Sequence, residues 1–208
     1  MQKGMLFVVS GPSGTGKGTV CKRVKKELEI SISVSMTTRK PRAGEIEGES
    51  YYFVTHDEFR NALKRNGFLE YAQVYGNYYG TPKAKVLEKL NAGMDVLLEI
   101  DIQGALNVKK AFPDSILIFL LPPSLEELEK RIVARGTETE EAIRLRLGES
   151  LRELSYVYQY DYCIINDELQ DAVDAVASVI RAEHARVRKG IRELIQSYEK
   201  SIKGGFLL

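Results

Sequence analysis

A glycine-rich stretch, GPSGTGKGTV from Gly11 to Val20, has the residue types and spacing of a loop that holds phosphate groups. It fits the pattern G-x-x-x-x-G-K-[ST] from Gly11 to Lys17, and it directly follows an apolar run that ends at Val9. Glycines let backbone N–H groups wrap around phosphate oxygens, and the lysine reaches the β- and γ-phosphates. We therefore expect ATP to bind through Gly11, Pro12, Ser13, Gly14, Thr15, Gly16, Lys17, Gly18 and Thr19.

Gly18 stands where the pattern asks for a hydroxyl that would hold Mg²⁺. The metal can still be bound, because Mg²⁺ keeps several of its waters and can be held by the ATP phosphates. The run DVLLEID ends in Glu99 and Asp101, placed as in a Walker-B strand, and a period of two puts both side chains on one side. Alternatively, one of them caps a helix that begins near Gln103. We expect Mg²⁺ as the cofactor, with Thr19 and Asp101 holding it directly or through water.

Strand-like apolar runs alternate with helical patterns along the chain, which predicts a mostly parallel sheet covered by helices. The helix after the glycine-rich loop should bury Val20, Val24 and Leu28. The fold class we predict is α/β, with a three-layer phosphate-loop core. The predicted strands are Met5–Ser10, Asp95–Ile100, Ser115–Leu121 and Asp161–Ile165.

The alternation stops between residues 36 and 82, a segment too long for an ordinary connection. We interpret 36–82 as an inserted substrate-binding subdomain, and about 136–147 as a small lid within a core made of 1–35 and 83–208. Four aromatic residues should form the core of the subdomain: Tyr52, Phe53, Tyr71 and Tyr75. The stretch from Leu169 to Ile202 should be helical with a break at Gly190, its last turns packing on the core or on a second subunit.

The subdomain carries residues suited to a phosphate group. Arg39 and Arg42 flank a single Lys-Pro, and Tyr51 follows a short way on. Paired guanidinium groups give bidentate contacts to phosphate oxygens, and a tyrosine hydroxyl adds a neutral donor. A later stretch, FLEYAQVYGNYYGTP, adds Glu70, Tyr79 and Thr81.

With these residues the chain resembles the guanylate kinases, from Gly11 to about Asp167. The motifs that carry the resemblance are TTRKPRAGE, GNYYGT, DIQG and RGTET. The resemblance implies transfer of the γ-phosphoryl group of ATP to GMP or dGMP, giving ADP and GDP, in purine nucleotide metabolism. It assigns binding of the GMP phosphate to Arg39, Arg42, Tyr51 and Tyr79, and of guanine to Ser35, Glu70, Thr81 and Asp101.

The resemblance also brings lid arginines onto the transferred group, so that the implied catalytic residues are Lys17, Arg39, Arg131, Arg135 and Arg146. The chemistry of guanine agrees with its implied site. Guanine presents N1–H and N2–H₂ side by side, which one carboxylate can accept together, whereas adenine has an acceptor at N1. A kinase for another nucleoside monophosphate is therefore disfavoured by Glu70. A guanylate-kinase-like interaction module that has lost catalysis is disfavoured by the intact loop with Lys17.

Composition excludes several other classes. The chain has 208 residues, a formal net charge of +1, 44% hydrophobic and 28% charged residues, which is typical of a globular protein without an affinity for nucleic acid or membranes. Cys21 and Cys163 have no metal-ligand spacing, and we expect both to be buried. With no signal-peptide pattern at Met1, we expect a cytoplasmic protein whose partners are ATP and GMP; its oligomeric state stays open.

Overall fold

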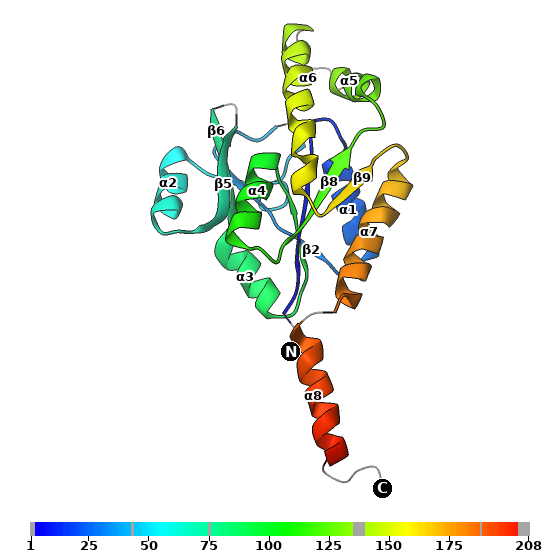
Figure 1. Ribbon diagram of the computed structural model, residues 1–208. Coiled ribbons are helices and arrows are strands. Elements are labelled where there is room, and N and C mark those ends of the chain that lie inside the picture. Colours follow the sequence, from blue (N-terminus) through cyan, green and yellow to red (C-terminus); the bar gives the residue numbers. More distant parts are fainter. Residues whose placement is uncertain (1–2, 43, 75, 135–139, 188, 204–208) are drawn as a thin grey trace.

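The computed structural model describes residues 3–42, 44–74, 76–134, 140–187 and 189–203, and the described part has an α/β architecture (Figure 1). All four predicted strands form, and a fifth, two-residue strand joins them at the edge of one parallel sheet. In spatial order these strands are β2 (Ser31–Ile32), β7 (Val96–Glu99), β1 (Leu6–Ser10), β8 (Ile116–Leu121) and β9 (Tyr162–Ile165).

Helices cover both faces of this sheet because its central strands are apolar on both sides. Phe7 and Val9 point to one face and pack with α1 and α7, while Leu6 and Val8 point to the other and pack with α3 and α4. The result is three layers, as predicted. The helices are α1 (Lys17–Glu27), α3 (Lys83–Asn91), α4 (Ile102–Ala111) and α7 (Leu169–Ala185).

Helix α1 buries Val20 and Val24, as its spacing predicts. Leu28 lies just beyond the helix, where its N–H donates to the carbonyl oxygen of Val24 at 2.9 Å, and its side chain is only partly buried against the same core. The difference arises because the chain turns to an extended conformation at Leu28.

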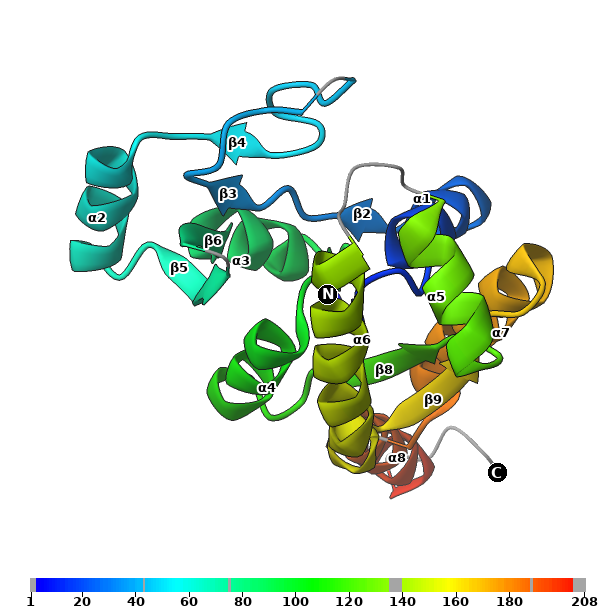
Figure 2. The same ribbon diagram turned by 90° about the horizontal axis from the view of Figure 1, so that it is seen from above.

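A second sheet lies to one side of the first (Figure 2). Its strands, in spatial order, are β4 (Tyr52–Phe53), β3 (Met36–Thr37), β6 (Asn77–Pro82) and β5 (Phe68–Val74), with α2 (His56–Lys64) beside them. The aromatic core differs from the prediction: Phe59 of α2 stacks on Phe68 and Tyr78, with ring centroids 4.3 and 5.3 Å apart. Tyr71 is 45% exposed, because β5 is the edge strand and its pairing with β6 shifts between Phe68 and Tyr71. Tyr75 lies outside the described residues.

Two chain segments connect the second sheet to the core, and one of them has no loop. Strand β6 ends at Pro82, and α3 begins at Lys83, whose N–H donates to the carbonyl oxygen of Gly67 at 2.8 Å. On the other side, residues 33–35 connect β2 to β3.

The remaining elements are α5 (Leu125–Val133), α6 (Glu140–Leu154), the 3₁₀ helix η1 (Ser155–Gln159) and α8 (Lys189–Lys203). Helix α5 is capped by Ser124, whose hydroxyl accepts from the backbone N–H of Glu127 at 3.1 Å. Helices α7 and α8 are separated at Arg186, which is extended, and not at Gly190, which lies within α8. Cys21 is buried but Cys163 is exposed, contrary to the prediction, because β9 is an edge strand.

No helix among the described residues is long and apolar enough to cross a membrane.

Candidate active site

The glycine-rich loop runs from the carboxyl end of β1 into α1. Gly11, Gly14 and Gly16 have φ values of 146°, 92° and 84°, which residues other than glycine rarely adopt. Lys17 Nζ donates to the carbonyl oxygens of Gly11 and Pro12, at 2.7 and 2.9 Å. The lysine therefore lies over the loop, next to the helix N-terminus, where backbone N–H groups and the helix dipole favour an anion.

Asn166, a residue with no predicted role, links this loop to β9 and α5. Its side-chain Nδ2 donates to the backbone carbonyl oxygen of Thr15 at 2.8 Å, and its backbone carbonyl oxygen accepts from Arg131 Nη1 at 2.9 Å. A Cβ at Gly16 would lie 2.5 Å from Asn166 Nδ2, so this close approach requires glycine. A signal existed in the sequence, because Asn166 follows directly on a predicted strand whose carboxyl end meets the phosphate loop.

Arg39, Tyr51 and Tyr79, all expected to bind one phosphate, lie together in the structure. The guanidinium carbon of Arg39 is 5.5 Å from the centroid of the Tyr51 ring, and the Tyr51 and Tyr79 centroids are 6.0 Å apart. Glu45, to which the sequence had given no role, orients the side chain of Arg39 and the backbone at Arg42. Its Oε1 accepts from Arg39 Nη2 at 2.8 Å, and its Oε2 accepts from the backbone N–H of Arg42 at 2.7 Å. The hydrogen bond from Arg39 lowers the pKa of Glu45, so this carboxylate is ionised at neutral pH.

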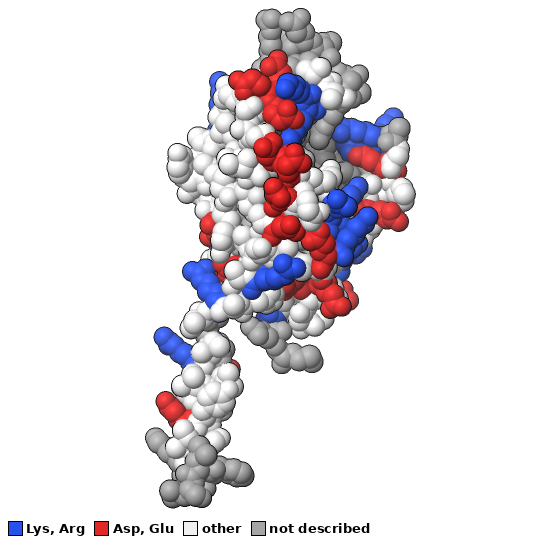
Figure 3. Space-filling view, turned by 90° about the vertical axis from the view of Figure 1, so that its right-hand side faces the viewer, with Lys and Arg blue, Asp and Glu red and all other residues white. Residues whose placement is uncertain are grey.

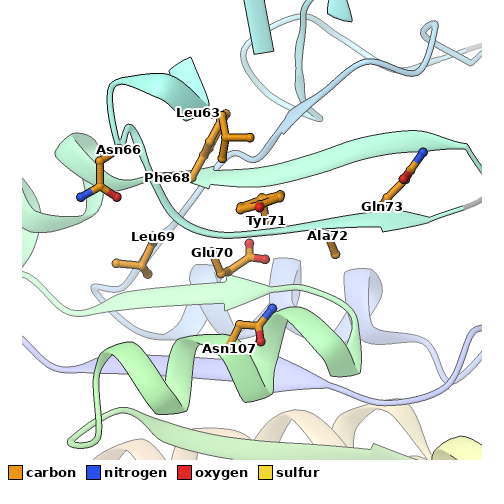
Figure 4. Close-up of a pocket in the computed structure, with 9 residues that line it drawn as sticks. All are labelled: Leu63, Asn66, Phe68, Leu69, Glu70, Tyr71, Ala72, Gln73 and Asn107. Carbon is orange, nitrogen blue, oxygen red and sulfur yellow. The ribbon is translucent and has the colours of Figure 1, made fainter. Parts of the chain in front are cut away.

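Glu70 is a buried carboxyl between β5 and α4. The Thr81 hydroxyl donates to Glu70 Oε1 at 2.7 Å, and a Cβ at Gly104 of α4 would lie 2.8 Å from Oε2. Burial raises the pKa of Glu70 to about 7; the hydrogen bond from Thr81 opposes this rise, and the charge of Asp101 adds to it. Glu70 also lines a hollow of about 450 Å³ between β5, the end of α2 and Asn107 of α4 (Figure 4).

Two other residues predicted for the guanine site lie on neighbouring segments. Ser35 is half-buried in the connection between β2 and β3, and its carbonyl oxygen accepts from the Tyr52 N–H at 2.8 Å. Asp101 is the N-cap of α4, and its Oδ1 accepts from the Gly104 N–H at 2.9 Å. The structure therefore brings Glu70, Thr81 and Asp101 together.

Comparison with known proteins identifies the family of this chain. A family model described as guanylate kinase matches residues 3–183. The chain belongs to the guanylate kinase family. Among curated guanylate kinases, that of Clostridium tetani is 57% identical over 187 residues, or 90% of each chain. That of Clostridium acetobutylicum is 53% identical and covers 99% of this chain and 98% of its own. The crystal structure of guanylate kinase from Anaplasma phagocytophilum has a TM-score of 0.80 and 34% identity, and covers 94% of this chain and 95% of its own.

In this member of the guanylate kinase family, a carboxylate lies beside the position that lacks a hydroxyl. A Cβ at Gly18 would lie 3.1 Å from Oε1 of Glu99, the last residue of β7. Glu99 is also close enough to raise the pKa of Cys21 and of Tyr51, in both cases after the larger effect of burial. Asp101 has different neighbours, because β7 ends before it and its side chain caps α4. Of the two acidic residues, Glu99 therefore lies nearer to the first turn of α1.

The residues expected to form the lid are described only in part. Arg131 of α5 donates from Nε to Glu127 Oε1 at 3.0 Å and, as noted above, reaches Asn166, so its guanidinium is tied to the segment that holds the phosphate loop. Arg135 and the side chain of Arg146 lie outside what the structure describes. Glu153 of α6 lies within electrostatic range of Lys17. Burial raises the pKa of the Glu153 carboxyl, and the positive charge of Lys17 opposes part of this rise.

Proposed function

We infer that this protein transfers the γ-phosphoryl group of ATP to GMP, giving ADP and GDP. The observation that carries the inference is the buried Glu70 carboxyl, held by the Thr81 hydroxyl at 2.7 Å, in a chain that keeps an intact phosphate loop with Lys17. A carboxylate in this position accepts from the N1–H and N2–H₂ of guanine together, whereas adenine would face it with a lone pair.

We propose that the phosphate of GMP binds between Arg39, Arg42, Tyr51 and Tyr79. Glu45 supports this proposal because it fixes the guanidinium of Arg39 in place beside the Tyr51 ring. Arg42 is exposed, so it would meet the phosphate at the mouth of the site. Ser35 and Asp101 would complete the recognition of guanine.

Catalysis by these residues rests on positioning and charge stabilisation. A phosphate monoester has a second pKa of about 6, so GMP is an anionic nucleophile at neutral pH and needs no general base. Lys17 and the arginines at positions 39, 131, 135 and 146 would stabilise the charge that spreads over the transferred group in a loose in-line transition state. Closure of the second sheet and the lid over the core would exclude water and so prevent hydrolysis of ATP.

The test is ADP production from ATP with each of GMP, dGMP, AMP, CMP and UMP. We expect GMP to be the preferred acceptor, and dGMP measures how much the ribose hydroxyl contributes. Turnover of AMP or a pyrimidine nucleotide at a similar rate would contradict the role of Glu70. Binding of GMP without any turnover would instead favour an interaction module derived from the same fold. We place this activity in the cytoplasm.

Mg²⁺ would bind with ATP and would neutralise part of the charge on its phosphates. Among the described residues, no group of three or more His, Cys, Asp or Glu is placed to hold a metal. This fits a cation held chiefly by phosphate oxygens and waters. The protein side of the site, as we propose it, comprises Thr19, Asp101 and Glu99, whose carboxylate lies beside Gly18.

Substitutions at these positions should change the Mg²⁺ dependence by different amounts. We expect Glu99→Gln to raise the free Mg²⁺ concentration for half-maximal rate by about tenfold or more, as for other residues that bind a metal through water. Thr19→Ala and Asp101→Asn should shift it less. Gly18→Ser should be tolerated and should lower the requirement, because the added hydroxyl lies beside a carboxylate that can adjust. Rates measured against free Mg²⁺ decide the ranking; a larger shift for Asp101→Asn would move the metal role there.

The raised pKa of Glu70 predicts a pH dependence. Guanine requires the ionised carboxylate, and kcat/KM for GMP reports the free enzyme, in which the pKa is about 7. The rate constant should therefore rise about tenfold from about pH 6 to about pH 8, as the ionised fraction rises. The GMP phosphate also titrates in this range, but it does so in the assays of both proteins. Dividing kcat/KM of the parent enzyme by kcat/KM of Glu70→Gln at each pH therefore removes its contribution. A constant ratio over this range would show that Glu70 is already ionised throughout.

A further inference from the structure

Helix α8 carries an apolar face that the rest of the described chain does not cover. Figure 1 shows the helix leaving the body of the molecule next to the N-terminus, at the edge of the parallel sheet opposite the phosphate loop. Figure 3 shows it as a projection with much uncharged surface. Six large apolar residues on α8 and just before it are between 43% and 82% exposed: Val187, Ile191, Leu194, Ile195, Tyr198 and Ile202.

The spacing of these residues puts them on one side of the helix. The five on the helix are Ile191, Leu194, Ile195, Tyr198 and Ile202; at 3.6 residues per turn they form a single stripe about 100° wide, and Val187 lies just before the helix. Isolated helices of this length are marginal in water, and an apolar stripe gains its stability by being covered. We propose that the stripe packs antiparallel against the same helix of a second copy of this chain.

The stripe is symmetric about its own centre, which suits a two-fold axis. With the axis between residues 194 and 195, Ile191 meets Tyr198 of the second copy and Leu194 meets Ile195, while Ile202 lies level with the start of the other helix. The four central apolar side chains of one copy thus each face a large apolar side chain of the other. A two-fold contact is self-complementary in this sense.

Charges beside the stripe favour the antiparallel orientation. Arg192 and Glu199 lie two turns apart on one flank, while Ser197 and Ser201 lie on the other. An antiparallel two-fold arrangement brings like flanks together, so Arg192 of each copy comes within about 3 Å, measured along the helix axis, of the level of Glu199 in the other. A parallel pair would instead place the charged flank against the serines.

The same charges argue against a membrane surface as the partner. Helices that bind anionic lipids have a polar face dominated by Lys and Arg. Here two acidic residues accompany the basic ones; the charged residues from 189 to 203 are Lys189, Arg192, Glu193, Glu199, Lys200 and Lys203. A second copy therefore fits the charge pattern better than a bilayer.

Sedimentation equilibrium of the full-length chain tests the proposal. The helix is only about 22 Å long, so the interface is small and we expect a dissociation constant of about 1–100 μM. Leu194→Glu should weaken the dimer about 100-fold or more, because it places a charge at the centre of the contact. The kinase activity per chain and the melting temperature should not change, since α8 lies away from the proposed site and from the core.

Charge reversal provides the matched control. Arg192→Glu or Glu199→Arg alone brings like charges together at two related points and should weaken the dimer about 3- to 30-fold; the double reversal should restore it. A parent chain that stays monomeric at about 200 μM, a dimer that survives Leu194→Glu, or a double reversal that fails to restore would each overturn the proposal. Co-sedimentation of a monomeric parent chain with vesicles containing phosphatidylglycerol would assign the stripe to a membrane surface instead.

Discussion

Lys17→Ala should lower kcat for phosphoryl transfer by about 10³-fold while leaving the affinity for GMP nearly unchanged. Lys17 lies over the phosphate loop, bonded to the carbonyl oxygens of Gly11 and Pro12, and no step of GMP recognition that we propose involves it. Its charge acts on the γ-phosphoryl group as that group leaves ATP. Steady-state kinetics gives the rate, and titration calorimetry with GMP alone gives the affinity.

Lys22→Ala is the matched control, because Lys22 is an exposed lysine on the same helix and should have no effect on either quantity. The melting temperature of both variants shows whether the fold is intact. If Lys17→Ala abolished GMP binding and spared turnover, the two nucleotide sites would have been assigned the wrong way round.

Glu70→Gln should lower kcat/KM for GMP by about 10²-fold, or ~3 kcal/mol, without lowering that for AMP. The amide keeps the volume of the side chain but turns one acceptor oxygen into a donor, which then faces N1–H or N2–H₂ of guanine. The remaining oxygen can still accept from Thr81. Kinetics with both nucleotides is the measurement, and Glu88→Gln on the exposed side of α3 is the control.

The stability of the same variant checks that its loss of activity is not a loss of fold. Because burial raises the pKa of Glu70 from 4.5 to about 7, the ionised carboxylate destabilises the nucleotide-free protein. This cost is absent below about pH 4.5, grows between the two pKa values and reaches on the order of 3 kcal/mol above pH 7. Glu70→Gln should therefore melt at a higher temperature than the parent at pH 8. Equal losses for GMP and AMP together with a lower melting temperature would make Glu70 a structural residue.

The phosphate loop and the parallel sheet could be predicted from the sequence because their determinants are local. The loop lies within nine residues, and the apolar runs that flank it have the length of buried strands. The two-residue strand β2 escaped notice, since Ser31 and Ile32 have no pattern of their own and pair only because β7 lies beside them.

Tertiary neighbours decide the features that the sequence did not reveal. The environment of Glu70 depends on the approach of Gly104 from α4, which is far away in the sequence. The prediction that Glu99 and Asp101 lie on the same side of one strand is wrong. The strand ends at Glu99, and Asp101 is the N-cap of the helix that follows. The apolar pattern of α8 is evident in the sequence, but not that the helix projects from the body.

The direct passage from β6 into α3 limits how the second sheet can move. Proline fixes φ at Pro82, and Lys83 is already helical, so this crossing has few free torsions to serve as a pivot. Val86 and Leu90 of α3 are packed in the same core cluster as Leu6 and Val8 of the central strand. A rotation that closes the second sheet over the core would thus pivot at residues 33–35, which connect β2 to β3. At the β6–α3 junction it would shift α3 along the parallel sheet. The motion is a shear of packed side chains more than a free hinge, and its amplitude is limited by how far that helix can slide.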